Sequence, residues 1–408
     1  MNILNKLRTN EAWEQYKAFI ENNQIFVDKH LLSKINSVIE AGVENITLQF
    51  PVPTKKEISK YKNMKKRTVY SFGEPYNTYL KCINYLLQID PHYKKKFCVN
   101  SIAYQQGKSV KHYVDAMSKQ IQLRSRKYFI KTDFTDYFNS IDLNILIKKM
   151  QKFFLTQDAD LYELLVGMLS RKEVKVNGSI ELIDKKGVMA GLPISGYLAN
   201  VYMNDVDWEM YKRHIYYTRY ADDVIILTNN IERDKQLFNE LLEPLNVKLN
   251  PKKIDEGTIK DGVTFLGFKF EKGRIDISQR GIDKMKSRIK RRSKWFSAWL
   301  SKKNVKRDIA ARTFIKGMNN KFYSRGEEDG TCWMEWYGKN LTTDESLKKI
   351  DEYMCQYIRY LLSGKQKGYK KNAEIPYETL KQLGFRPLVN EYWKVKKQIA
   401  KNNELNKK

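Results

Sequence analysis

Hydrophobic residues recur at helical spacing through much of the N-terminal third of the chain. Apolar positions three and four residues apart predict helices over residues 11–22, 29–41 and 77–88. Pro51-Val-Pro-Thr interrupts this pattern, and a basic stretch follows over residues 55–67. The next residues, 68–72, have the β-branched and aromatic composition of a strand. We therefore expect a largely helical beginning with one short strand.

The pattern changes from Tyr128 onward. Short runs rich in β-branched and aromatic residues predict strands over residues 128–133, 215–220, 224–227 and 264–270. Helical runs separate them, and beyond about Glu271 amphipathic helices continue to the end of the chain. Short strands separated by helices in this way predict an α+β fold.

Charge is concentrated in the last third of the chain. Residues 271–408 hold 34 Lys+Arg and 16 Asp+Glu, which is +18 of the total +28. In one helical stretch of this region, an apolar face is formed by Ile282, Met285, Ile289, Phe296 and Trp299. The other sides carry basic residues, namely Lys284, Lys286, Arg288, Lys290, Arg291, Arg292 and Lys294. Such a run can be a solvated face, but so few acids are interleaved that contact with phosphates is favoured.

Composition excludes several classes of protein. A net charge of +28 indicates a polyanionic partner, and 42% hydrophobic residues are enough to form real cores. No apolar run is long enough to span a bilayer, and the N-terminus has no signal-like apolar segment, so we expect a cytoplasmic protein with no membrane partner. The four cysteines are far apart and read as reduced thiols.

Two adjacent carboxylates mark the sharpest chemical feature. Tyr220-Ala221-Asp222-Asp223 lies between two predicted strands, so a tight hairpin would carry both aspartates at its tip. Taken alone, this could be an ordinary surface turn, in which aspartate is common. A second strand ends on Asp133, however, and a sheet could bring its carboxylate to the same place. A cluster of oxygen ligands suits Mg²⁺, and two such ions about 4 Å apart are typical of in-line phosphoryl displacement.

At this point the sequence resembles the reverse transcriptases. Asp133-x4-Phe138, Gly191-Leu-Pro-Ile-Ser195 and Tyr220-Ala-Asp-Asp223 resemble motifs A, B and C of that family, in the same order. Leu249-Asn-Pro-Lys-Lys253 resembles motif D, and Phe265-Leu266-Gly267-Phe268 resembles motif E, the primer grip. Two upstream segments resemble the fingers motifs, namely Lys65-Lys-Arg67-Thr-Val-Tyr and Asn100-Ser-Ile-Ala-Tyr-Gln-Gln-Gly107. The resemblance covers roughly residues 60–270.

The resemblance implies roles for these residues at the metal site. Asp133 and Asp222 would be the main metal ligands, Asp223 a weaker carboxylate, and the backbone carbonyl of Phe134 a further ligand. The metal would be a pair of Mg²⁺ ions, with Mn²⁺ as a substitute. Lys253 would be a general acid for the leaving pyrophosphate, with an ordinary surface lysine as the alternative.

The resemblance also implies a binding site for the triphosphate and sugar of a dNTP. Arg67 and Lys66 would clamp the triphosphate, while generic RNA contact is an equal alternative for Lys65. Phe138 would exclude a ribose 2′-OH, which implies deoxynucleotide substrates. Gly191 and Ser195 would let the backbone approach the new base pair, although Gly-Leu-Pro is also an ordinary entry to a helix.

Departures from the family pattern narrow the choice of subfamily. Ala190 stands where motif B usually has glutamine, and the retron signatures are absent. With no histidine after His214, the His-Asn-His nuclease of group II intron proteins is absent too. The helical C-terminal region, with its segment 377–388, is most similar to the bacterial defence-associated, or unknown-group, reverse transcriptases.

The resemblance therefore implies a right-hand polymerase with an antiparallel palm sheet. We expect N-terminal helices and fingers over residues 1–125, a palm over 126–270, and a helical thumb with a basic extension over 271–408. The expected reaction is RNA-directed DNA synthesis with dNTPs on a primer–template duplex, copying a structured noncoding RNA in antiphage defence. The alternatives are a retron- or intron-type enzyme and, in another class, an inactive RNA-binding scaffold. The sequence indicates no oligomeric state.

Overall fold

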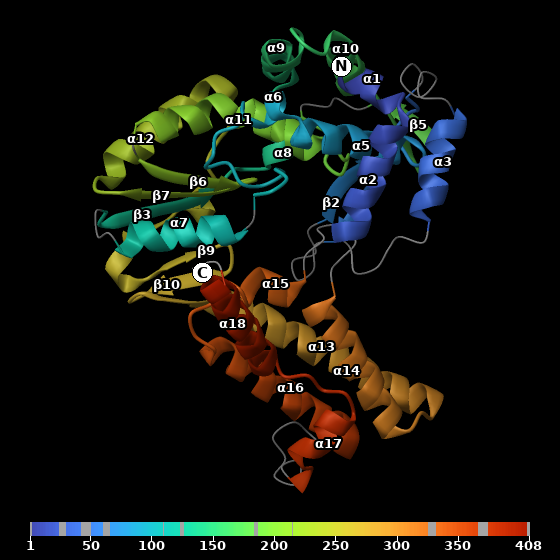
Figure 1. Ribbon diagram of the computed structural model, residues 1–408, viewed down its shortest axis with the longest axis vertical. Coiled ribbons are helices and arrows are strands. Elements are labelled where there is room, and N and C mark those ends of the chain that lie inside the picture. Colours follow the sequence, from blue (N-terminus) through green and yellow to red (C-terminus); the bar gives the residue numbers. More distant parts are fainter. Residues whose placement is uncertain are drawn as a thin grey trace. The chain divides into compact units, whose positions relative to one another are not determined.

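The computed structural model describes residues 2–23, 30–41, 50–59, 66–108, 110–122, 126–182, 187–213, 215–324, 332–365 and 374–405 (Figure 1). These residues form two compact units. The first contains the described residues up to 108 together with 126–257, and the second contains 110–122 together with the described residues from 258 onward.

Helices make up most of the first unit. They are α1 (Ile3–Leu7), α2 (Asn10–Asn23), α3 (Leu31–Ala41), α5 (Tyr76–Ile89), α6 (Pro91–Lys94), α8 (Tyr137–Ser140), α9 (Leu143–Phe154), α10 (Ala159–Ser170), α11 (Ser195–Lys212) and α12 (Ile231–Leu242), with 3-10 turns at Glu243–Leu245 and Pro251–Lys253. The helices predicted over residues 11–22, 29–41 and 77–88 are confirmed, each within about two residues at its described end.

A four-stranded sheet lies at the centre of this unit. Its order is β6 (Tyr216–Tyr220), β7 (Asp223–Thr228), β3 (Tyr128–Asp133) and β8 (Asp255–Thr258). The central pairings of β7 with β6 and with β3 are antiparallel. Helices α11 and α12 cover one face of the sheet (Figure 1). Three of these strands match the sequence prediction, whereas β8 has too little apolar character to be recognised.

Helix α11 is the centre of the hydrophobic core. Twelve of its residues are buried, on all sides of the helix, so it lacks the polar stripe of a surface helix. The helix for which Gly191-Leu-Pro was considered an entry begins at Ser195, shortly after that segment. Four buried polar residues on α11 interrupt this apolar surface, and two of them, Asn200 and Asp207, have no exposed surface and need partners inside the core.

A second sheet in the first unit has the order β2 (Lys66–Ser71), β1 (Thr54–Ser59), β4 (Glu173–Val176) and β5 (Ser179–Leu182). Strand β2 is the strand predicted from residues 68–72. Strand β1 pairs with it antiparallel and meets β4 in a parallel pairing at Thr54 and Lys175. The Lys and Glu residues of β1 and β4 hid these strands from the sequence pattern, and β5 is a four-residue strand whose residues are all exposed.

The second unit contains α7 (Val110–Gln122), a three-stranded sheet and a helical bundle. The sheet has the order β11 (Arg274–Ile277), β10 (Phe268–Glu271) and β9 (Val263–Phe265), preceded by a 3-10 turn at Ile259–Asp261. The helices that follow are α13 (Gln279–Lys303), α14 (Arg307–Tyr323), α15 (Trp333–Tyr337), α16 (Glu345–Ser363), α17 (Tyr377–Gln382) and α18 (Leu388–Leu405). Ile282, Met285, Ile289 and Phe296 are buried on α13, which confirms its predicted apolar face.

Two predictions about this region were wrong. The single strand expected over residues 264–270 is two strands, because Leu266 and Gly267 have φ values of 49° and 86° and reverse the chain between them. Strands also continue past Glu271, since β11 pairs with β10 across a turn at Lys272 and Gly273. In each case a tight turn divides a pattern that reads as one element.

No helix in the described ranges is both long and apolar enough to cross a membrane. All four cysteines are free thiols, and three of them are buried.

Candidate active site

The three motif aspartates lie at one end of the central sheet. Asp133, the last residue of β3, is the direct cross-strand partner of Asp223, the first residue of β7. Asp222 occupies the two-residue turn between β6 and β7, which Ala221 enters with a φ of 57°. Opposed residues of an antiparallel pair project to the same face. The backbone therefore brings together the carboxylates that the sequence predicted to meet.

Asp133 is the most buried of the three carboxylates. Its exposed fraction is 3%, and its Oδ1 atom is buried without a hydrogen-bond partner. A buried carboxylate oxygen with no partner is costly, which fits a position that a cation completes. The donor set consists of oxygen atoms only, as hard divalent cations such as Mg²⁺ require. As they stand, no group of three or more His, Cys, Asp or Glu side chains among the described residues is arranged to hold a metal ion.

Lys253 lies at this cluster, in the 3-10 turn Pro251–Lys253. Its ammonium group forms an ion pair with Oδ2 of Asp133, although 57% of the lysine side chain is exposed. The segment is held in place by a short antiparallel bridge between Phe134 and Leu249. The two hydrogen bonds of this bridge use the carbonyl of Asp133 and the N–H of Thr135. Neither bond uses the carbonyl of Phe134, the predicted backbone ligand.

The loop that carries Gly191 packs against strand β2. Tyr70 N–H donates to the carbonyl of Ala190 at 2.8 Å. Gly191 has a φ of 98°, and a Cβ atom there would lie 3.0 Å from Cβ of Val69 and 3.1 Å from the carbonyl oxygen of Tyr70. Both the backbone angle and the close approach therefore require glycine. In this way the motif B loop is joined to the strand that carries Arg67.

Tyr104 connects the fingers motif to the aspartates. It is a non-glycine residue with a φ of 57°, and its ring lies over Gly196 at the start of α11. Burial raises the pKa of its hydroxyl, the charge of Asp222 raises it further, and Arg67 lowers it. Arg67 and Asp222 thus both lie near one phenol group, which the sequence analysis did not single out.

Phe138 lies beside this tyrosine. Its ring meets that of Tyr104 edge-on, with the centroids 6.5 Å apart, and it is half-buried on α8. Asp136, two residues earlier, is exposed, has a φ of 46° and accepts hydrogen bonds from Asn139. It therefore belongs to the turn before α8 and not to the carboxylate cluster.

Two predicted nucleotide contacts have protein partners. Lys66 forms an exposed ion pair with Glu57 on the neighbouring strand at 2.7 Å. Ser195 is buried and donates its hydroxyl to the carbonyl of Met189 at 2.6 Å, so it closes the loop around Gly191. Lys65 lies outside the described residues.

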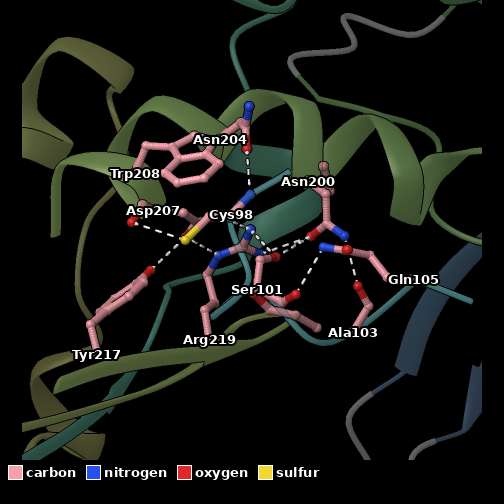
Figure 2. A network of polar contacts seen from close by, with 12 residues as sticks. Cys98, Ser101, Ala103, Gln105, Asn200, Asn204, Asp207, Trp208, Tyr217 and Arg219 are labelled. Carbon is pink, nitrogen blue, oxygen red and sulfur yellow. Dashed lines mark hydrogen bonds and ion pairs between the residues drawn. The ribbon is translucent and has the colours of Figure 1, made fainter. Parts of the chain in front are cut away.

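A buried ion pair between Arg219 and Asp207 contacts the backbone of the hairpin that carries Asp222 (Figure 2). Arg219 and Asp207 have no exposed side-chain surface, and Nε and Nη2 of the arginine donate to the two carboxylate oxygens at 2.8 and 2.5 Å. Burial alone would lower the pKa of Arg219, but the charge and hydrogen bonds of Asp207 raise it above its usual range. Nη1 donates to the carbonyl of Ala221 at 3.0 Å, directly before Asp222.

The same arginine connects three segments of the chain. It donates to Oδ1 of Asn200 and to the hydroxyl of Ser101, each at 3.0 Å, and its backbone forms a bridge with Ser101 (Figure 2). Tyr217 donates to Asp207 from the same face of β6. Sequence reasoning missed this network. Its signal is the charged Arg219, two residues after Tyr217 in a strand without other charges, together with Asp207 on a helix that is otherwise largely apolar.

The remaining predicted residues belong to the second unit. Phe265 is buried against Tyr113, and Leu266 and Gly267 form the β9–β10 turn. The basic residues of α13 are exposed or half-buried, in contrast to its apolar face. Lys286 lies over the ring of Tyr353 at 5.3 Å, and Arg292 packs against Gly317 of α14.

Comparison with known proteins identifies one family whose profile matches this sequence. The profile of the reverse transcriptases (RNA-dependent DNA polymerases) matches residues 55–270. None of the curated proteins matches the chain.

Solved structures of telomerase are also similar. The first, apo telomerase from Candida tropicalis truncated from its C-terminal domain, is 14% identical with a TM-score of 0.43, over 56% of this chain and 55% of that one. Candida albicans telomerase in complex with a fragment of telomeric RNA is 12% identical with a TM-score of 0.41, over 90% and 71%. This chain thus spans about half the length of the first. Because the family profile covers more than half of the sequence, the chain belongs to the reverse transcriptase family.

Proposed function

We propose that the protein is an RNA-directed DNA polymerase that adds dNTPs to a primer by two-metal-ion catalysis. The observation that carries this proposal is the register of Asp133 against Asp223, with Asp222 in the adjoining turn. Three carboxylates at one sheet end, next to Arg67 and Phe138, are the parts that nucleotidyl transfer needs.

Asp133, Asp222, Asp223 and the carbonyl of Phe134 would hold the two Mg²⁺ ions, for which Mn²⁺ would substitute. Bound there, the ions would supply charge stabilisation to the attacking 3′-oxygen and the leaving pyrophosphate. The unpartnered Oδ1 of Asp133 supports this assignment. The chain contributes fixed carboxylates on two paired strands, so their separation is set by the sheet.

Other residues of the first unit would bind and orient the dNTP. Arg67 presents a planar guanidinium that can bond two phosphate oxygens, and Lys66 would add charge once released from Glu57. Phe138 would occupy the space that a 2′-OH needs, and Gly191 would admit the base pair. Ser195 would act through the loop it closes. Lys253 carries a proton at Nζ beside Asp133, from where it could protonate the leaving group.

Residues 1–125 would act as N-terminal helices and fingers, 126–270 as the palm, and 271–408 as the thumb with its extension. Phe265, Leu266 and Gly267 would hold the primer strand. The basic residues of α13 would bind the phosphates of the primer–template duplex and of the RNA, a contact that should weaken with salt.

The biological setting we propose is bacterial antiphage defence in the cytoplasm, with a dedicated structured noncoding RNA as template. The helical C-terminal region and its segment 377–388, similar to those of defence-associated reverse transcriptases, support this. The net charge of +28 supports a large RNA partner.

Primer extension on an RNA template tests the chemistry. Asp222→Asn should abolish Mg²⁺-dependent incorporation of dNTPs while the protein stays folded. Asp136→Asn is the matched control, because this nearby aspartate lies outside the cluster and asparagine tolerates its positive φ. Extension by Asp222→Asn at the wild-type rate would overturn the assignment.

Sequencing the RNA that copurifies with the protein tests the template. One short structured transcript is expected, whereas a ribozyme-like intron would indicate an intron-type enzyme. A plaque assay in a bacterial host should show protection by the wild type and none by Asp222→Asn. Equal protection by both would indicate a scaffold role.

A further inference from the structure

A cavity of about 320 Å³ opens in the second unit, between α13, the end of α14 and the short helix α15. Three cations line it, Lys284, Arg288 and Lys321, together with three aromatic rings, Trp333, Trp336 and Tyr337. No acidic residue is among the described residues that line it. We call it the aromatic–cationic pocket. Its volume lies at the lower end of the roughly 300–1,000 Å³ range of ligand pockets.

The three cations have no partner among the residues that the structure describes. None of them makes a hydrogen bond or an ion pair with another residue in the described ranges, although ion pairs are frequent elsewhere on this surface. Arg288 is half-buried, and burial lowers the pKa of its guanidinium, with a further decrease from Arg292. A partly desolvated cation without an anion is unfavourable, so Arg288 favours an anionic ligand at this position, and the exposed Lys284 and Lys321 beside it add to the positive charge.

The aromatic rings form the other wall of the pocket. Trp333 and Tyr337 pack with their centroids 4.8 Å apart, and Trp333 is fixed edge-on against Phe322 of α14 at 5.6 Å. All three rings stay half-buried and reach the cavity. Rigid aromatic faces next to cations are what single-stranded nucleic acids use, the bases stacking on the rings and the phosphates on the cations.

The pocket adjoins the β9–β10 turn. The hydroxyl of Tyr337 lies against Gly267, and its ring packs on Phe268 at 5.0 Å. Burial raises the pKa of Tyr337 to about 12, so this hydroxyl stays neutral near pH 7. The pocket is therefore continuous with the proposed primer-holding turn.

We propose that the aromatic–cationic pocket binds one unpaired nucleotide of a single-stranded nucleic acid, with its base against Trp336 and Tyr337 and its phosphate against Lys284, Arg288 and Lys321. This rests on the proposed function, but it adds a site for a base outside the duplex. A paired base, stacked within a helix, could not enter a cavity of this size.

The test measures binding without metal or dNTP, so that a failure of polymerase activity cannot affect it. The probe is a labelled thymidine strand of about ten nucleotides, compared with an abasic strand that has the same phosphates. The wild type should bind the thymidine strand roughly 5- to 150-fold more tightly than the abasic strand, because only the thymidine strand has bases that can stack. A uridine strand run in parallel shows whether RNA or DNA is preferred.

Two variants separate the contribution of the base to binding from the contribution of the phosphate. Trp336→Leu should remove most of the preference for bases over abasic residues. Lys321→Gln should weaken binding of both strands and reduce the slope of log K against log salt by about 0.7. Lys316→Gln, an exposed lysine on the same helix α14 but outside the pocket, should change neither quantity.

Unchanged unfolding midpoints would show that the variants remain folded. The proposal fails if Trp336→Leu keeps the full preference for bases with both thymidine and uridine strands. It also fails if Lys321→Gln and Lys316→Gln behave alike, or if Trp336→Leu weakens binding of a fully paired duplex as much as binding of the single strand.

Discussion

Replacing Arg219 by methionine should be among the most damaging single changes in the chain. The substitution removes the hydrogen bonds to both oxygens of Asp207 and those to Asn200, Ser101 and Ala221. Asp207 would then remain without exposed surface, and among the residues that the structure describes only the hydroxyl of Tyr217 would still donate to its carboxylate.

The magnitude follows from the burial of the pair. Breaking a fully buried ion pair by removing one partner costs about 3–5 kcal/mol, because the remaining charge stays desolvated. In a unit of this size, that corresponds to a fall in the melting temperature of roughly 6–20 °C. Replacing both partners by apolar residues should cost much less, so Arg219→Met with Asp207→Leu should recover most of the loss.

Thermal unfolding of the single and double variants measures this coupling. Asp205→Asn is the control, because Asp205 lies on the same helix, is 81% exposed and forms a surface ion pair with Lys149 at 2.8 Å. Loss of this surface ion pair should lower the free energy of unfolding by less than about 1 kcal/mol. The reasoning is refuted if Arg219→Met costs no more than Asp205→Asn, or if the double variant is as unstable as the two single variants combined.

Primer extension by a second variant, Arg219→Lys, distinguishes an effect on the position of Asp222 from an effect on the stability of the protein. Arg219→Lys keeps a charge but cannot reach Asp207 and the carbonyl of Ala221 in the same geometry. If this bond positions Asp222, primer extension should fall on the order of 100-fold at a temperature where the variant is fully folded. Wild-type activity there would show that the network serves folding alone.

Three further predictions concern other parts of the chain. Phe138→Ala should raise the use of ribonucleotides relative to deoxynucleotides by roughly 10- to 200-fold in primer extension, and an unchanged ratio would remove the steric role. Gly196→Ala should destabilise the protein by about 1–3 kcal/mol, because the new Cβ would lie 2.5 Å from the ring of Tyr104; the cost should disappear in a Tyr104→Ala background, and its persistence there would contradict the contact. Burial raises the pKa of Asp351 from 3.8 to about 6, so the folded state binds more protons than the unfolded state in that window and stability falls as the pH rises through it. The melting temperature of the wild type relative to Asp351→Asn should therefore decrease across this range, and a constant difference would refute the shift.

The local spacing of hydrophobic residues was sufficient to predict many of the helices and strands. The helices around residues 11–22 and 77–88 and the strand ending at Asp133 were predicted within a few residues. The helices are strongly periodic because each buries one face, whereas the strand was recognised from its short β-branched and aromatic run, which is buried on both faces. Strands β1, β4 and β8 were missed because half of their residues are charged, and β5 because it is only four residues long and exposed. The turn at Leu266 and Gly267 was missed because its backbone angles are not encoded in hydrophobicity.

The sequence by itself determined the family motifs, the order of the three aspartates, and the basic character of the last third. These are properties of residue type and spacing, which need no knowledge of contacts. Only the tertiary structure decided that Asp133 opposes Asp223, that Arg219 holds the carbonyl before Asp222, and that cations and aromatic rings from α13, α14 and α15 line one cavity. The reason is physical: the two opposed aspartates and the walls of the cavity come from separate segments that strand register and core packing bring together, and the short-range bond of Arg219 depends on the buried partner that orients its guanidinium.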